Sequence, residues 1–397
     1  MNRFLSVFSP AQLRRITSGE NYVPEIDGVR FVAIMFVLIQ HLHERVLRRT
    51  EAFYPDIPET LFHTAGAGVS VFFALSGLIL YRGLANSTSR TGTLKLKSYF
   101  IRRLTRLEPP YVLVMTILLV YLTFVGYDSP NVRRLNDGPD SLFAAYLASL
   151  SYTYCMIFGA LPKLNGVAWS LEIEVQFYIL APLIAVLMFR SRIGNRALIF
   201  CAIAFVWAYA VTPVAYSNLH TRWTILTCLP YFLAGIAVEE YCRNLVSKRL
   251  SNAVASLADM VGLGSLVAIA TVQLSPESPW QSTLKVLLAL GALWGMLHGS
   301  VWRRVLSIPW ISVIGGMCYT IYLIHMPILE VGANLTSKVG AGLPYPIYLM
   351  IQSCFLLPAV LVASIIFYVM IERPCMNKNW PSNLVNAVYR QLRWKQF

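Results

Sequence analysis

The sequence predicts an all-α fold, a polytopic membrane bundle of about ten transmembrane helices. Apolar residues make up 56% of the 397 residues and charged residues only 13%, whereas an ordinary soluble domain carries about 25% charged residues. Apolar stretches long enough to cross a bilayer recur along the whole chain. The basic residues gather in short loops between these stretches, as they do on the cytoplasmic side of membrane proteins.

Ten segments are apolar and long enough to be predicted as spans. In chain order they are 26–44, 64–84, 107–126, 169–189, 197–216, 223–241, 253–273, 282–300, 310–330 and 346–371. An eleventh apolar segment, 141–159, could cross the bilayer, lie flat on it or re-enter it. Ten crossings put the basic clusters that follow the fourth, sixth, eighth and tenth spans in the cytoplasm. The positive-inside rule therefore favours ten spans, with both termini cytoplasmic and a re-entrant or interfacial segment at 141–159.

The polytopic core is flanked by two short polar ends. Residues 1–24 are expected to form a cytoplasmic or interfacial N-terminal segment, residues 25–376 the transmembrane domain, and residues 377–397 a basic cytoplasmic tail. No apolar core precedes residue 26, so the beginning of the chain does not resemble a cleavable signal peptide.

Charge and cysteine content argue against two other classes of protein. The formal net charge is +14, but no basic stripe with interleaved aromatics occurs, so we expect no nucleic-acid partner. The seven cysteines are scattered without C-x-x-C spacing, so we expect neither a disulfide framework nor a metal site. The expected surroundings of the chain are a lipid bilayer.

Two polar residues of the first span share one helix face. Arg30 precedes His41 by eleven residues, which is within about 20° of three full helical turns and places the two roughly 16 Å apart along the axis. Polar side chains inside a membrane helix are costly unless they face a cavity, a partner or a substrate. The pair therefore marks a candidate functional site, with Arg30 toward the cytoplasm and His41 toward the outside. Interfacial snorkelling of both side chains is the alternative.

The third span starts with a cluster of arginines. Arg103 and Arg106 are three residues apart and share a helix face, with Arg102 beside them. Paired guanidinium groups bind phosphate bidentately, which suits an anionic ligand at the cytoplasmic face. Simple anchoring of the helix at that face is the alternative.

Later spans carry carboxylates and a second histidine. Glu172 and Glu174 begin the fourth span, and at i, i+2 they cannot share a face, so one is expected to cap the helix and the other to point into the bundle. His325 lies toward the outer end of the ninth span, where a packed, hydrogen-bonded role competes with a catalytic one. Glu372 and Arg373, at the end of the tenth span, are expected to form an interfacial anchor.

These motifs resemble, in the same order, those of the acyltransferase 3 family of bacterial membrane O-acyltransferases. The similarity extends over about residues 24–376. It comprises I26-D-G-V-R30 with His41, V71-F-F-A-L-S-G-L78, Arg103-x-x-Arg106, W169-S-L-x-x-E-x-x-F-Y178, Y319-T-I-Y-L-I-H-M-P327 (with Cys318 where Ser is usual) and Glu372-Arg373-Pro374. Each motif alone is weak, whereas six in the right order are specific. The Gly and Ser of the second motif also suit close helix packing.

The resemblance implies a multi-pass enzyme of the bacterial cytoplasmic (inner) membrane. Such enzymes move an acyl group, usually acetyl, from cytoplasmic acyl-CoA to a sugar hydroxyl of a glycan or glycolipid, and the reaction needs no metal. Lipopolysaccharide, capsule, peptidoglycan and other acceptors all stay open, as do the acyl chain length and the oligomeric state.

The resemblance also implies roles for individual residues. His41 would be the general base, with a covalent acyl-histidine as the alternative, and Glu174 would orient a histidine. His325, as a further catalytic residue, and Tyr319 would position the substrate or stabilise an oxyanion. The remaining candidates are donor-phosphate residues (Arg30, Arg102, Arg103, Arg106) and substrate-binding residues (Trp169, Ser170, Tyr178, Tyr319).

Two other classes of function stay open on the sequence alone. A transporter of an acyl group or an acylated glycan would also explain buried Arg, His and Glu, but no inverted repeat or broken-helix pair is visible. A receptor or scaffold would not explain basic residues at one depth and histidine with carboxylate at another. Some relatives carry a fused extracytoplasmic domain, for which this chain is too short, so a separate partner could complete the transfer.

Overall fold

The computed structural model describes residues 9–16, 22–50, 54, 56–57, 64–91, 93–125, 139, 141–190, 195–244, 251–377 and 380. Helices are the only regular structure in these ranges, which confirms the predicted all-α class. Most of the predicted basic tail at 377–397, and residues 1–8 and 17–21 of the predicted N-terminal segment, lie outside the described residues.

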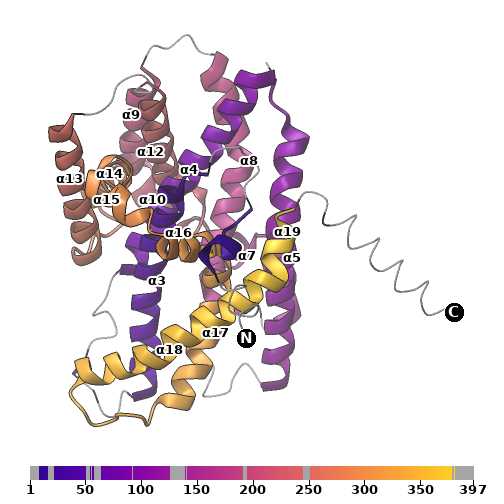
Figure 1. Cartoon of the computed structure of the whole chain (residues 1–397). Helices are drawn as coiled ribbons and strands as arrows, with labels where there is room; N and C mark the ends of the chain where they lie inside the picture. The colour runs from indigo at the N-terminus through magenta and orange to yellow at the C-terminus, as the bar shows by residue number, and fades with distance from the viewer. Residues whose placement is uncertain are drawn as a thin grey trace.

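Helical elements follow one another along the described parts of the chain (Figure 1). They are α2 (Pro10–Leu13), α3 (Pro24–Thr50), α4 (Thr64–Thr91), α5 (Leu96–Val125), α6 (Leu142–Leu150), α7 (Tyr154–Phe158), η1 (Gly166–Ala168), α8 (Trp169–Arg190), α9 (Arg196–Ala210), α10 (Thr212–Ser217), α11 (Leu219–Arg222), α12 (Ile225–Asn244), α13 (Asn252–Thr271), α14 (Pro279–His298), α15 (Ser300–Leu306), α16 (Pro309–Gly316), α17 (Cys318–Thr336), α18 (Tyr345–Phe367), the π-helical turn η2 (Tyr368–Glu372) and α19 (Arg373–Cys375).

Nine of the ten predicted spans coincide with helices that could cross a membrane. Within the described residues, seven single helices are long and apolar enough, and α14 with α15 and α16 with α17 form two further pairs, bent by 78° and 71°. The bend between α16 and α17 was not expected from the sequence, which reads there as one apolar run, 310–330. The other bend follows the end of the predicted span 282–300, and α15 beyond it carries Arg303 and Arg304. The predicted span at 197–216 contains α9, whose 15 residues are fewer than a crossing helix usually needs. The count of ten and the cytoplasmic termini therefore stay predictions.

The ambiguous segment 141–159 folds as two short helices, α6 and α7. They meet at Tyr152, which has φ 55°, a backbone conformation that cannot continue a helix. With nine and five residues, neither helix is long enough to cross a bilayer. The segment therefore does not cross as one continuous helix, in agreement with the expectation from charge. Glu172 of α8 holds α7 in place by accepting a 3.0 Å hydrogen bond from the backbone N–H of Cys155.

The centre of the bundle depends on close backbone contact between α4 and α12. A Cβ added to Gly77 would clash with the main chain at Phe232, and one added to Gly235 would clash with the main chain at Ala74. Only glycine allows helices to approach so closely. The expectation that the second motif serves close helix packing is therefore confirmed for Gly77.

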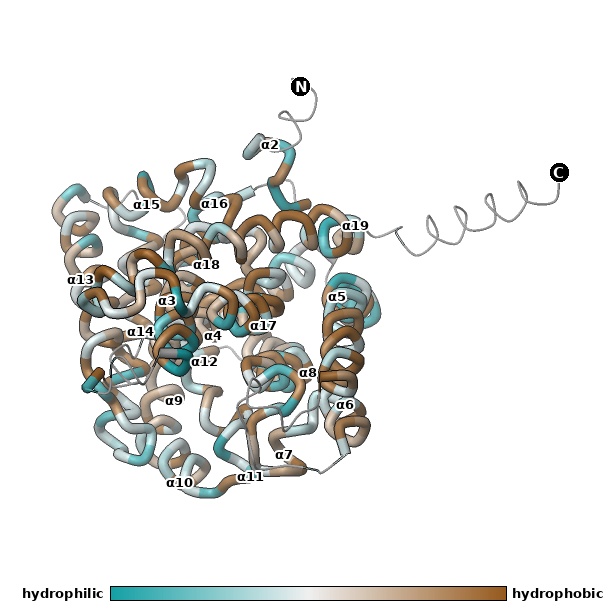
Figure 2. Tube along the Cα trace, turned by 90° about the horizontal axis from the view of Figure 1, so that it is seen from below, coloured by the Kyte–Doolittle hydropathy of each residue, from teal (hydrophilic) through white to brown (hydrophobic). Residues whose placement is uncertain are grey.

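The long helix α3 connects the parts of the molecule that matter for function. It packs against α4, α16 and α17. Seen along the bundle, α5 and α8 lie at one side of the molecule and α13 and α14 at the opposite side, with α3, α4 and α17 between them (Figure 2). The residues of α3 that face the α5 side therefore lie near the middle of the molecule.

Candidate active site

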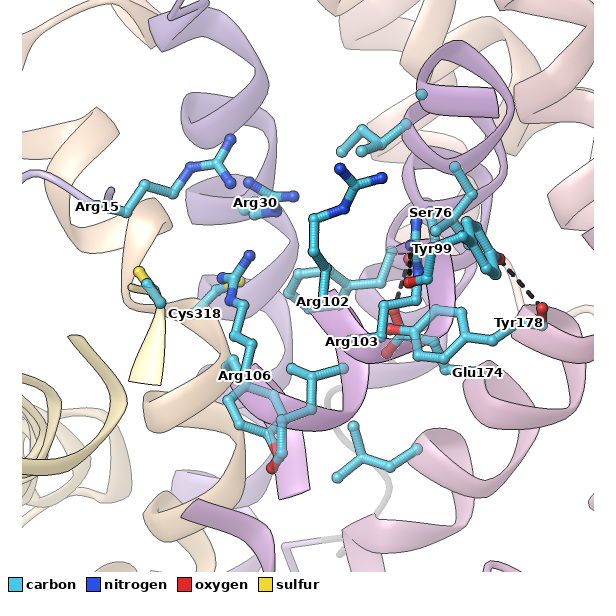
Figure 3. Close-up of a pocket in the computed structure, with 18 of the residues that line it drawn as sticks. Arg15, Arg30, Ser76, Tyr99, Arg102, Arg103, Arg106, Glu174, Tyr178 and Cys318 are labelled. Atoms are coloured by element: carbon cyan, nitrogen blue, oxygen red, sulfur yellow. Dashed lines mark hydrogen bonds between the residues drawn. The ribbon is translucent and has the colours of Figure 1, made fainter. Parts of the chain in front are cut away.

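A cavity of about 770 Å³ lies among α3, α4, α5, α8 and α17. Its volume falls in the range of about 300–1,000 Å³ that is typical of small-molecule sites. Eight of the predicted site residues line it: Arg30, Arg102, Arg103, Arg106, Ser170, Glu174, Tyr178 and Tyr319. All of them except Ser170 and Tyr319 are labelled in Figure 3. Three do not line it: His41, Trp169 and His325.

The lining of this cavity is strongly cationic. It contains six basic side chains, Arg15, Arg30, Lys95, Arg102, Arg103 and Arg106, and one carboxylate, Glu174. Positive charge in excess of carboxylate, inside a partly dehydrated cavity, favours a ligand with several negative charges.

Two fully buried carboxylates stand behind the lining. Asp27 bonds to Arg30 one turn further along α3, and it also accepts a 2.8 Å hydrogen bond from Arg15. Glu372 lies 3.5 Å from Arg106 and accepts a 2.6 Å hydrogen bond from Thr320. The predicted role of Glu372 as an interfacial anchor is therefore wrong, because its side chain is buried between α5 and α17.

Arg103 is held by aromatic rings rather than by an acid. Its guanidinium lies 3.7 Å from the centre of the Tyr99 ring and donates a 3.0 Å hydrogen bond to the Tyr99 backbone oxygen. The hydroxyl of Tyr99 in turn bonds to the backbone oxygen of Tyr178 on α8. Arginine stacked on a ring in this way keeps donors available for a further acceptor. Arg102, its neighbour in the sequence, is exposed at the cavity and makes no ion pair within the described residues.

Glu174 is placed differently from what the sequence suggested. It points into the bundle, while Glu172 turns away to α7, so the predicted divergence of the two carboxylates is confirmed. Among the described residues, however, Glu174 accepts its hydrogen bond from Ser76 of α4, at 3.0 Å, rather than from a histidine. The side chain lies in the wall of the cationic cavity, close to Tyr178 and Arg103.

The two predicted histidines contact each other directly. His41 Nδ1 lies 2.9 Å from His325 Nε2, and the two rings stack with their centres 5.2 Å apart. His325 is fully buried, whereas His41 is only partly buried. The sequence placed both residues toward the same end of the bundle but gave no reason to pair them.

The hydrogen bonds of His325 determine which ring nitrogens carry protons. Its Nδ1 lies 3.0 Å from the Ile321 backbone oxygen and 2.8 Å from that of Tyr322. Because carbonyl oxygens only accept, Nδ1 is the protonated nitrogen and Nε2 of the neutral ring is an acceptor. His41 must then donate from Nδ1, which leaves the lone pair of His41 on Nε2. The arrangement therefore sets His41 up as a base at Nε2.

Tyr322 connects the wall of the cavity with this histidine pair. Tyr322 lines the cavity, and its ring centre lies 5.8 Å from that of His325. Its hydroxyl is fixed by Ser170 at 2.6 Å and by the Val167 backbone oxygen at 3.1 Å. Trp169 lies outside this wall, where it packs against Phe73 and Trp223.

An ion-pair cluster lies one helical turn beyond the histidines. Glu330 of α17 bonds to Arg45, at 2.8 Å, and to Arg49, both on α3. Together with the histidine pair, it fixes α3 and α17 in one register. Glu330, Asp27 and Arg15 were not predicted from the sequence as site residues. Only Asp27 carries a local signal, since it lies three residues before Arg30 on the same helix.

Within the described residues, no group of three or more His, Cys, Asp or Glu side chains is placed to hold a metal ion.

The chain belongs to the acyltransferase family: a family model described as an acyltransferase domain matches residues 23–369. The chain is 25% identical over 377 residues to O-acetyltransferase OatA of Staphylococcus aureus (strain NCTC 8325), covering 90% of this chain and 58% of that protein. It is 27% identical over 338 residues to a Staphylococcus aureus (strain COL) protein that is provisionally named an O-acetyltransferase, covering 78% and 51%. This chain thus spans about half the length of the curated relatives it matches. No solved structure matches it. The protein is therefore a multi-pass membrane member of the acyltransferase family.

Proposed function

We propose that the protein is a membrane O-acyltransferase that moves an acyl group, in the first place acetyl, from cytoplasmic acyl-CoA to a sugar hydroxyl of a cell-envelope or secreted glycan. The observation that carries the proposal is a cationic cavity whose lining residue Tyr322 packs against a hydrogen-bonded histidine pair. Family membership and relatives named O-acetyltransferase support it. A bacterial inner membrane, with the cavity opening to the cytoplasm, is part of the proposal.

The donor site follows from the charges of the cavity. CoA carries several phosphate charges at its nucleotide end and a neutral, flexible arm that ends in the thioester. Arg30, Arg103 and Arg106 would bind the phosphates bidentately. His41 lies eleven residues beyond Arg30 on α3, roughly 16 Å along the helix axis, so the arm would extend along this face toward the histidines.

The chemistry follows from the protonation pattern of the pair. His41 Nε2 takes the proton of the acceptor hydroxyl while the oxygen attacks the thioester carbonyl. The tetrahedral intermediate collapses, the C–S bond breaks, and the CoA thiolate takes the proton back from the imidazolium. His325 Nε2 accepts a hydrogen bond from His41 Nδ1, and this bond strengthens when His41 becomes charged. His325 thus acts as a positioning residue, the role that the sequence gave to Glu174.

A covalent acyl-histidine stays the alternative to direct transfer. The same lone pair on His41 Nε2 could attack the thioester itself and pass the acyl group on in a second step. Incubation of the purified protein with labelled acetyl-CoA, in the absence of acceptor, separates the two routes. Stoichiometric label on His41 would support the covalent route, and unlabelled protein would support direct transfer.

A transporter is the second candidate, and the two bent helix pairs are the observation that favours it. The decisive experiment uses purified protein in detergent, with acetyl-CoA and a membrane glycan extract, and measures release of free CoA thiol. A transferase turns over without separate compartments, whereas a transporter needs them. CoA release that depends on the glycan extract supports the proposed function. Absence of such release from folded, purified protein contradicts it. Mass spectrometry of envelope glycans from cells with and without the protein would then identify the acceptor.

A further inference from the structure

The cationic cavity is completed by a segment that precedes the region matched by the family model. The match starts at residue 23, whereas Arg15 and Ile16 line the cavity. The segment is firmly packed: α2 lies against α16, and Leu13 is only 1% exposed. This packing holds Arg15 and Ile16 in the wall of the site.

Arg15 lies in a cluster of guanidinium groups that share one carboxylate. Its Nε donates a 2.8 Å hydrogen bond to Asp27, which also bonds to Arg30, so two cations are balanced by one anion. Arg106 is close enough to interact with Arg15 as well (Figure 3). Burial, followed by the nearby charge of Arg30, lowers the pKa of Arg15 to about 10. Arg15 therefore stays protonated at neutral pH, in surroundings that an added anion would stabilise.

The position of Arg15 along the site indicates which part of a donor it would meet. Asp27, its partner, lies on the side of Arg30 that is remote from His41. A thioester at the histidines would leave the nucleotide end of CoA, with its phosphates, at this remote end of the cavity. The positive charge of Arg15, its position near this end of α3 and its place in the cavity wall are therefore all consistent with binding of phosphate.

We propose that Arg15 is a donor-binding residue, which together with Arg30 and Arg106 binds phosphate at the nucleotide end of acyl-CoA. The inference rests on the proposed function and adds to it a specificity-determining residue from outside the matched region. The alternative is a purely structural role, in which Arg15 only holds the N-terminal segment against α3 through its bond to Asp27.

The experiment compares two donors, acetyl-CoA and acetyl-pantetheine, which keeps the thioester arm but lacks the nucleotide and its phosphates. Arg15→Ala should raise KM for acetyl-CoA by about tenfold to a hundredfold, the usual effect of losing a charge-assisted hydrogen bond, with kcat nearly unchanged. Its KM for acetyl-pantetheine should equal that of the wild type. Arg15→Lys should show a smaller rise, again confined to acetyl-CoA, because lysine keeps the charge but loses the planar fork.

Arg14→Ala is the matched control. Arg14 is the preceding residue and carries the same charge, but it stacks on Tyr22, 3.3 Å from the ring centre, and does not line the cavity. This variant should keep the wild-type KM for both donors, which would exclude a long-range effect of charge.

The outcomes separate three cases. A wild-type KM for acetyl-CoA in Arg15→Ala, or an equal loss with both donors, would overturn the role of Arg15. If Arg15→Ala does not accumulate in the membrane, KM for the two donors is compared in Arg15→Lys instead, where only KM for acetyl-CoA should rise. Failure of the wild-type protein to use either donor would instead overturn the proposed function.

Discussion

The two ends of α3 are built in opposite ways. At the Arg30 end, side chains from five long helices and the N-terminal segment line a wide cationic cavity. At the His41 end, a single 2.9 Å contact joins two histidines, one of them fully buried. The difference suggests that donor binding is shared among many residues, whereas proton transfer depends on one bond. Loss of one cavity residue should therefore weaken donor binding and leave kcat nearly unchanged, whereas loss of either histidine should lower kcat.

The largest effect is expected from His41. Replacement by Ala or Gln removes the base at Nε2 and should lower kcat by about 10²–10⁴-fold. KM for the donor should change little, because no donor-phosphate contact is lost. Steady-state assays of CoA release on purified variants check this. A kcat within a few-fold of wild type would refute the base assignment.

His325 should come next. His325→Ala removes the acceptor for His41 Nδ1 and should lower kcat by about 10–150-fold, the equivalent of one hydrogen bond to a charged group. His325→Gln offers an amide oxygen at a similar reach and should recover part of the loss. Equal losses in both variants would indicate that the residue serves packing alone. A shifted pH profile of kcat in the Gln variant would further support positioning, since packing alone would leave the pKa of His41 unchanged.

The cationic cavity should respond in KM rather than in kcat. Arg103→Ala combined with Arg106→Ala removes two of six basic side chains and should raise the Kd for acetyl-CoA by at least about tenfold. Either single variant should show a clearly smaller change. Isothermal titration of acetyl-CoA into purified protein measures this, with circular dichroism as the folding control. An unchanged Kd for acetyl-CoA in the double variant would show that Arg103 and Arg106 do not bind the donor phosphates.

The smallest effect is expected from Glu174. Its hydrogen bond goes to Ser76, and its carboxylate lies in the cationic wall. Glu174→Gln keeps the shape and one acceptor, so kcat should stay within about tenfold of wild type. A loss as large as that of His325→Ala would instead show that Glu174 orients a histidine during turnover, as the sequence had suggested.

Much of the fold could be predicted because its signals are local. Hydropathy located the nine helices or helix pairs that could cross a membrane. The i, i+2 spacing of Glu172 and Glu174 correctly predicted that their side chains point in different directions. The bend at Met317 was missed, since apolar composition continues through it, whereas Gly299 lies at the end of the predicted span 282–300. Whether a long apolar run is straight depends on what packs against it.

The candidate site could be predicted only as a set of residues, not as contacts. The partners His41 and His325 are 284 positions apart, and nothing local specifies that their rings meet. Glu372 was misread because a carboxylate followed by Arg and Pro at a helix end is typical of an interface. Its burial depends on α5 and α17, and the π-helical turn that carries it leaves no mark in the sequence.

The separation of binding from chemistry along α3 is the central claim. Equilibrium binding of labelled acetyl-CoA to purified His41→Ala tests it most directly. An unchanged Kd, in a variant whose turnover is lost, is the predicted result. A Kd weakened as much as in the variant lacking Arg103 and Arg106 would contradict the claim, because the two ends of the helix would then act as one site.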